Sequence, residues 1–69
     1  MKPGELRRFR DNLDSLVAAH ASGQTFLVLE VAKLRRGCRR LVILIDGKTE
    51  SGWGYAWVEA NSEVISEAR

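Results

Sequence analysis

The chain has 69 residues and little of what small domains use to reinforce a core: one cysteine, one histidine and one proline. Cys38 has no second cysteine with which to form an internal disulfide, and one cysteine with one histidine cannot supply the four ligands of a structural zinc site. A chain of this length buries only about 60% of its unfolded surface, so its core is marginal. Self-association is the reinforcement that remains open.

Long apolar runs and an export signal are also missing. No uninterrupted apolar run approaches the ~20 residues that cross a bilayer, and the N-terminus MKPGELRRFR has no apolar signal segment. With a single thiol, these features predict a cytoplasmic protein. A hydrophobic content of 45% at a net charge of +2 favours one folded domain spanning residues 1–69.

Motifs that carry chemistry are absent as well. There is no glycine-rich phosphate loop, nucleophile motif or metal motif, and no two titratable groups are placed together for acid–base work. The sequence therefore predicts a non-enzymatic protein without a cofactor, a metal or a small-molecule substrate. An enzyme would need a partner subunit to complete a site around His20, Cys38 or Glu30.

The spacing of the apolar residues predicts an α+β domain that begins with a long N-terminal helix. Over residues 4–21, apolar residues recur at spacings of three and four, with Pro3 suited to a helix start and Gly23 to a helix end. The predicted apolar stripe consists of Leu6, Phe9, Leu13, Leu16, Val17 and His20.

A three-stranded antiparallel meander is expected to follow. Residues 25–34 and 40–46 are rich in branched apolar residues, and Asp46-Gly47 is a strong turn dipeptide. If the first reversal has an even-length loop, Ala32 faces Ile43 and Val31 faces Leu44. The segment GWGYAWV, residues 52–58, alternates small and aromatic residues as a third strand would.

The final segment SEVISEAR, residues 62–69, predicts a short C-terminal helix capped by Asn61 or Ser62. The predicted order is therefore αβββα, with strand 40–46 in the centre. This order is similar to that of double-stranded-RNA-binding domains. Those domains carry lysines at the start of the final helix, where this chain has Glu59 and Glu63, so no family is assigned.

Both faces of such a sheet would be apolar, because the strands do not alternate apolar and polar residues. One long helix and one short helix cover only one face, and a large exposed apolar patch indicates an interface. The sequence therefore predicts a homo-oligomer, with a dimer favoured.

The segment KLRRGCRR forms the predicted arginine hairpin, residues 33–40, at the end of a two-stranded ribbon. Arginine suits phosphate oxygens, which predicts contact with nucleic acid phosphates or an acidic partner; the alternative is a charged turn that only keeps the sheet end soluble. The candidate binding residues are Lys33, Arg35, Arg36, Arg39 and Arg40, with Arg7, Arg8 and Arg10 as an extension.

The aromatic residues Trp53, Tyr55 and Trp57 share one face of the expected third strand. Exposed beside arginines they would stack on unpaired bases; buried they would be core. A rival hypothesis is therefore a protein–protein interaction module, such as an inhibitor, an adaptor or a small mobile-element protein. Its interface would comprise Trp53, Tyr55, Trp57, Phe26 and Val28.

Overall fold

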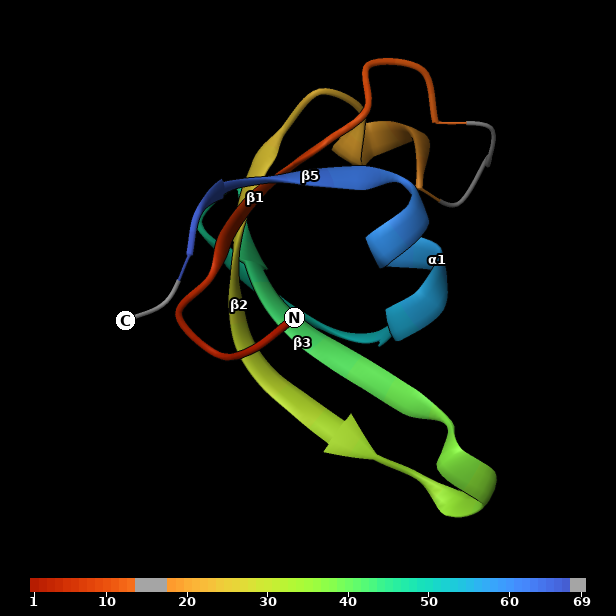
Figure 1. The fold of residues 1–69 in the computed structure, drawn as a ribbon. Helices are drawn as coiled ribbons and strands as arrows, with labels where there is room; N and C mark the ends of the chain where they lie inside the picture. The colour runs from red at the N-terminus through yellow and green to blue at the C-terminus, as the bar shows by residue number, and fades with distance from the viewer. Residues whose placement is uncertain (14–17, 68–69) are drawn as a thin grey trace.

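The computed structural model describes residues 1–13 and 18–67. Within these residues the chain forms five β-strands, one short α-helix and two 3₁₀ turns (Figure 1). The strands are β1 (Leu6–Phe9), β2 (Thr25–Lys33), β3 (Arg39–Ile45), β4 (Lys48–Gly54) and β5 (Ser62–Ser66), and the helix is α1 (Tyr55–Ala60). The predicted αβββα class is wrong: the protein is mostly β-sheet, and α+β describes it only loosely.

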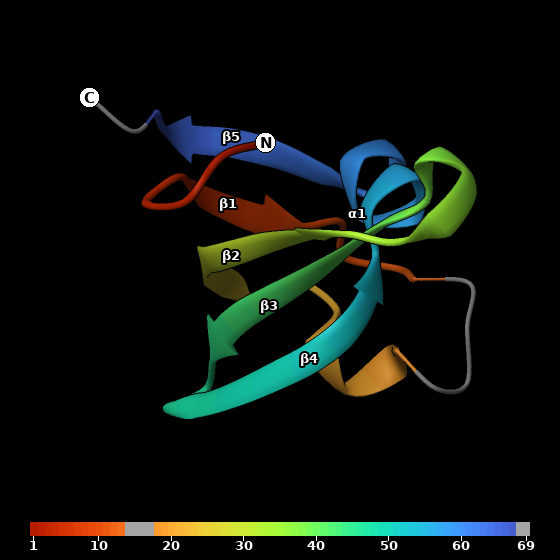
Figure 2. The same ribbon diagram turned by 90° about the horizontal axis from the view of Figure 1, so that it is seen from below.

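All five strands join one antiparallel sheet in the order β4-β3-β2-β1-β5. The central strand is therefore β2, and not strand 40–46 as predicted. The last strand in sequence pairs with the first, through Arg7 opposite Val64 and Arg8 opposite Glu63. The sheet curls as it passes from β4 to β5, and α1 packs at its concave side (Figures 1 and 2).

The predicted N-terminal helix over residues 4–21 is wrong. Residues 6–9 form β1, which pairs with β2 through Leu6 opposite Leu27. Helical structure in this region is limited to the 3₁₀ turn Ala19–Ala21 among the described residues, and residues 14–17 lie outside them. The buried side chains alternate along β1 and the residue before it, as Glu5, Arg7 and Phe9, which is the period of two that a half-buried strand requires.

The predicted strands 25–34 and 40–46 correspond to β2 and β3, but their predicted register is wrong. Ala32 pairs with Arg40 and Val31 with Leu41. The loop is odd in length: Leu34 N–H donates to the Cys38 carbonyl across the 3₁₀ turn Arg35–Gly37. Arg36 and Gly37 have positive φ, which three-residue hairpin loops accommodate at their left-handed position.

A β-bulge at Leu29 explains how a charged residue fits inside the apolar run TFLVLEVA. Phe26 and Val28 face the core, so strict alternation would bring Glu30 inward as well. The register shifts between Val28 and Glu30, and Leu29 is the extra residue. Glu30 consequently lies on the exposed outer face, while Val31 turns toward the core.

The predicted Asp46-Gly47 turn is confirmed. It joins β3 to β4 as a two-residue loop, since Ile45 pairs directly with Lys48. Both turn residues have positive φ, as type I′ hairpins demand.

The predicted third strand, residues 52–58, is only partly a strand. β4 ends at Gly54, and Tyr55–Ala60 forms α1. Gly52 lies where the β3–β4 register shifts and has a φ of 82°, a conformation that side chains other than glycine rarely adopt. This bulge, together with the start of α1 at Tyr55, means that the three aromatics do not share one strand face.

The predicted C-terminal helix over residues 62–69 is also wrong, because Ser62–Ser66 form β5. Residues 68 and 69 lie outside the described residues. Asn61 does cap a helix, but at its C-terminal end: its side-chain amide donates to the Trp57 carbonyl of α1. Helix α1 therefore turns the chain from the edge strand β4 toward β5, which lies across the sheet.

The core fills the concave side of the curled sheet. It contains the buried residues Phe9, Leu13, Ala18, Ala21, Phe26, Val28, Leu41, Ile43, Ile45 and Val58. Phe9 and Phe26 stack at its centre, with ring centroids 4.3 Å apart. By register, Leu6, Leu27 and Leu44 lie side by side on the opposite, outer face. That face is mixed, because exposed Arg8 and Glu30 share it.

Candidate functional site: an aromatic cleft beside the arginine hairpin

Two tryptophans on consecutive elements come together at one side of the sheet. Trp53 pairs with Leu41 across β4 and β3, so its side chain points to the concave side. Trp57 projects from α1, and the two ring centroids lie 5.9 Å apart. Phe9 contacts both from within the core, at 5.2 Å from Trp53 and 6.2 Å from Trp57. Both tryptophan rings are half-buried. Phe9 packs against them from the core, and their other side faces the cleft.

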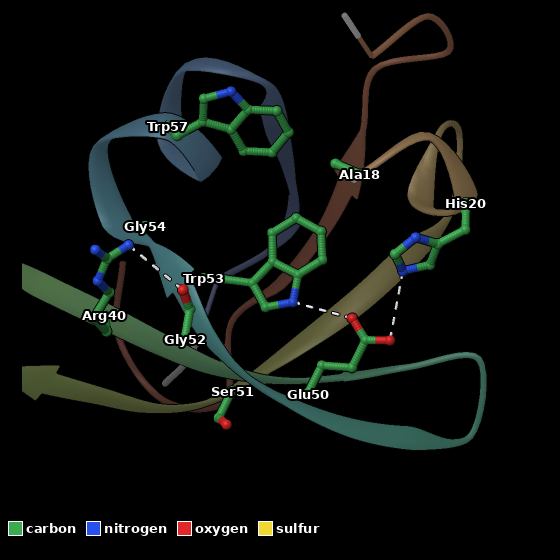
Figure 3. A pocket seen from close by; sticks show the side chains of 9 residues that line it. All are labelled: Ala18, His20, Arg40, Glu50, Ser51, Gly52, Trp53, Gly54 and Trp57. Carbon is green, nitrogen blue, oxygen red and sulfur yellow. Dashed lines mark hydrogen bonds and ion pairs between the residues drawn. The ribbon is translucent and has the colours of Figure 1, made fainter. Parts of the chain in front are cut away.

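These rings line an open cleft of about 450 Å³ (Figure 3). Its walls come from β4, from Arg40 on β3, from α1 and from the chain around the 3₁₀ turn at residues 19–21. The lining residues are Ala18, His20, Arg40, Glu50, Ser51, Gly52, Trp53, Gly54 and Trp57. The volume and the mainly apolar lining leave ample room for a flat aromatic group.

Glu50 gives one end of the cleft a negative charge. Its Oε1 accepts a hydrogen bond of 3.1 Å from the Trp53 indole Nε1, and its Oε2 lies 3.5 Å from His20 Nε2. The His20 ring in turn lies 6.2 Å from the Trp53 ring. Trp53 therefore holds the carboxylate in place at the cleft wall.

The other end of the cleft is positive. Arg40 lines it, and its Nη1 reaches to 3.5 Å from the Gly52 carbonyl. In Figure 3, Arg40 lies to one side of Trp53, and Glu50 with His20 to the other. A bound molecule would thus meet a guanidinium, an aromatic surface and a carboxylate in that order.

The arginine hairpin, residues 33–40, projects beyond the rest of the ribbon (Figure 1). All eight of its residues are exposed, including Lys33, Arg35 and Arg36 near the tip. Arg39 lies over the Tyr55 ring of α1 with its guanidinium carbon 3.8 Å from the centroid. This cation–π contact holds the hairpin against α1, and Arg40, which lines the cleft and contacts Gly52, connects the hairpin to the cleft.

The structure separates the remaining candidate residues from this surface. Phe26 and Val28 are fully buried, so they offer a partner no surface. Arg7 is buried and bound to Glu5. Arg8 and Arg10 are exposed, but they line a different hollow of about 380 Å³ that also contains Asp11 and Glu63.

Sequence reasoning did not assign Glu50 or His20 to this site. Glu50 lies between the predicted Asp46-Gly47 turn and the predicted third strand, and His20 lies in the stretch interpreted as a helix face. The signal for Glu50 was its position three residues before Trp53, which brings the two side chains to one face only because Gly52 forms a bulge. That bulge is a tertiary feature.

Among residues 1–13 and 18–67, no group of three or more histidine, cysteine, aspartate or glutamate side chains could hold a metal ion. In the same part of the chain no helix is long and apolar enough to span a membrane. Comparison with family models, with curated proteins and with solved structures found no match.

Proposed function

We propose that this protein is a non-enzymatic module that binds single-stranded nucleic acid. The observation that carries the proposal is the continuity of the arginine hairpin with the tryptophan cleft through Arg40, which lines the cleft, while Arg39 lies against the adjoining helix α1. Proteins that hold single strands combine cationic groups that follow the phosphates with aromatic rings on which bases stack. Both parts lie on one surface here.

The stacking surface supports a single strand better than a duplex. A base in a duplex is already stacked between its neighbours, whereas an unpaired base can enter a cleft of about 450 Å³. Trp53 and Trp57 are held from below by Phe9, so the site is preorganised. The hairpin arginines would contact phosphates without choosing a sequence.

The first test removes the Trp57 ring from the cleft. Trp57→Leu keeps an apolar side chain on α1 but removes the aromatic surface. Because stacking contributes about 1–3 kcal/mol per base, affinity should fall about 5- to 150-fold. The measurement is fluorescence anisotropy of a labelled 12-nucleotide oligo(dC) at low salt, with circular dichroism to confirm folding.

The control for this test is Leu29→Ala, which removes an exposed apolar side chain at the bulge of β2. Leu29 lies outside both the cleft lining and the arginine hairpin, so its loss should leave the affinity within about twofold of the wild type. A folded Trp57→Leu protein with unchanged affinity would show that the cleft does not hold a base. Binding of a protein partner through the same rings, the rival hypothesis, would then be favoured.

A homodimer remains a separate proposal. Its support is the row of Leu6, Leu27 and Leu44 on the outer face, together with Val64 and Ile65, which are half exposed on the edge strand β5. We expect light scattering to give a mass above the 7.7 kDa of one chain as concentration rises. A mass of 7.7 kDa throughout the micromolar range would rule the dimer out.

The free thiol of Cys38, which is exposed, fits a cytoplasmic setting.

A further inference from the structure

The opposite charges at the two ends of the cleft indicate which bases it binds, and this inference rests on the proposed function. Arg40 stands at one end and Glu50 at the other, with Trp53 between them (Figure 3). A nucleotide has the same polarity: its phosphate is an anion, its base is flat, and the far edge of the base carries hydrogen-bonding groups. A phosphate near Arg40 would direct that edge toward Glu50.

Glu50 can accept further hydrogen bonds. A carboxylate has about four lone-pair positions on its two oxygens, and the described contacts are the indole Nε1 of Trp53 at 3.1 Å and His20 Nε2 at 3.5 Å. The Glu50 side chain is 31% exposed, and it lines the cleft. The group that a base edge meets there is therefore an acceptor held in place by Trp53.

Bases differ in what they present to such an acceptor. Cytosine carries an amino donor at C4, where thymine carries a carbonyl acceptor. Adenine has the corresponding amino donor at C6. A carboxylate accepts from the amino group and repels the carbonyl oxygen, so Glu50 discriminates between the two pyrimidines although their rings stack similarly.

We propose that the cleft selects nucleobases with an exocyclic amino group over thymine and uracil, and that Glu50 is the residue which makes this choice. Trp53 is the positioning residue, because its indole N–H fixes the carboxylate. The contact would form when an amino hydrogen of the base lies within hydrogen-bond distance of a Glu50 oxygen.

The test compares labelled 12-nucleotide oligo(dC) and oligo(dT), which have equal charge and little structure of their own. The wild-type protein should bind oligo(dC) about fivefold or more tightly, as a base-edge hydrogen bond to a carboxylate implies. In Glu50→Gln the amide both donates and accepts, so the ratio of the two affinities should fall toward one. The loss of a negative charge should raise both affinities, which makes the ratio the informative quantity.

A third probe isolates the amino group. Oligonucleotides in which pyrimidin-2-one replaces cytosine lack only that group, and the wild-type protein should bind them more weakly than oligo(dC) but no more weakly than oligo(dT), since they also lack the carbonyl that Glu50 repels. Equal wild-type affinities for oligo(dC) and oligo(dT), or a preference that Glu50→Gln leaves intact, would overturn the selection while leaving the proposed function standing. If no oligonucleotide binds at low salt, both fail.

Discussion

Replacing Arg7 with alanine is expected to destabilise the fold by about 3–5 kcal/mol, because it leaves a buried acid without its counter-charge. Arg7 and Glu5 are 7% and 6% exposed, and Nη1 of the arginine lies 2.6 Å from Oε1 of the glutamate. A domain of this size has about 3–5 kcal/mol of stability in total. The remaining stability of Arg7→Ala should therefore be close to zero, so that a large fraction of the molecules, on the order of half, is unfolded at 25 °C.

The arginine also connects three elements. Its Nε donates to Ser62 Oγ at 2.9 Å and its Nη2 to the Ser62 carbonyl at 3.2 Å. The Ser62 hydroxyl donates in turn to the Val58 carbonyl at the end of α1. Arg7 thus links β1 to the start of β5, and its removal would weaken the pairing that brings the last strand to the first.

Urea denaturation followed by circular dichroism measures this effect, and the neighbouring Arg8 is the matched control. Arg8 is exposed and pairs with Asp11 at 2.9 Å in solvent, so Arg8→Ala should cost less than about 1 kcal/mol. The double variant Glu5→Leu/Arg7→Met replaces both charges by apolar groups and should be clearly more stable than Arg7→Ala. An Arg7→Ala protein as stable as Arg8→Ala would show that the buried pair does not hold β1 and β5 together.

Removing the hairpin arginines should have the largest effect on binding. In Arg35→Ala/Arg36→Ala/Arg39→Ala/Arg40→Ala, affinity for a 12-nucleotide oligo(dC) at about 0.1 M salt should fall by a factor on the order of 10² to 10³. The reason is the loss of up to four phosphate contacts, each of which releases counterions. All four residues are exposed, so the fold should remain intact.

The dependence of the affinity on salt distinguishes the contribution of the arginine hairpin from that of the tryptophan cleft. Losing four phosphate contacts should flatten the slope of log affinity against log salt by about 3, at roughly 0.7 per contact for a single strand. Trp57→Leu should lower the affinity and leave the slope unchanged. Lys48→Ala is the matched control, because Lys48 follows the Asp46-Gly47 turn at the other end of β3 from the hairpin. A slope unaltered by the fourfold substitution would exclude the hairpin as the phosphate contact.

Local sequence signals predicted the middle of the chain well. The branched residues of 25–34 and 40–46 indicated strands, and β2 and β3 occupy nearly the same residues. Asp46-Gly47 indicated a hairpin turn, because few other residues adopt positive φ without strain. In these segments the local preference and the final structure agree.

The ends of the chain were predicted wrongly because their apolar spacing fits a helix as well as a strand. Leu6 and Phe9 suggested a helical stripe, whereas the buried side chains are Arg7 and Phe9 of β1 together with Glu5 just before it. Two charged residues on a core-facing side hide the period of two. They are tolerated there because they neutralise each other and because Ser62, 55 residues away, accepts two hydrogen bonds from Arg7.

The sequence by itself determined that β2 and β3 are strands joined by an arginine-rich tip and that a tight turn leads into β4, since these depend on residues close together in the chain; the register of β2 against β3 was not determined in this way. Only the tertiary structure decided that β5 returns to pair with β1, that Glu5 and Arg7 are buried, and that Glu50, His20 and Arg40 surround Trp53 and Trp57. The physical reason is that a strand at the chain end gains stability from distant partners and from the burial that the whole sheet provides, and neither is encoded in local spacing.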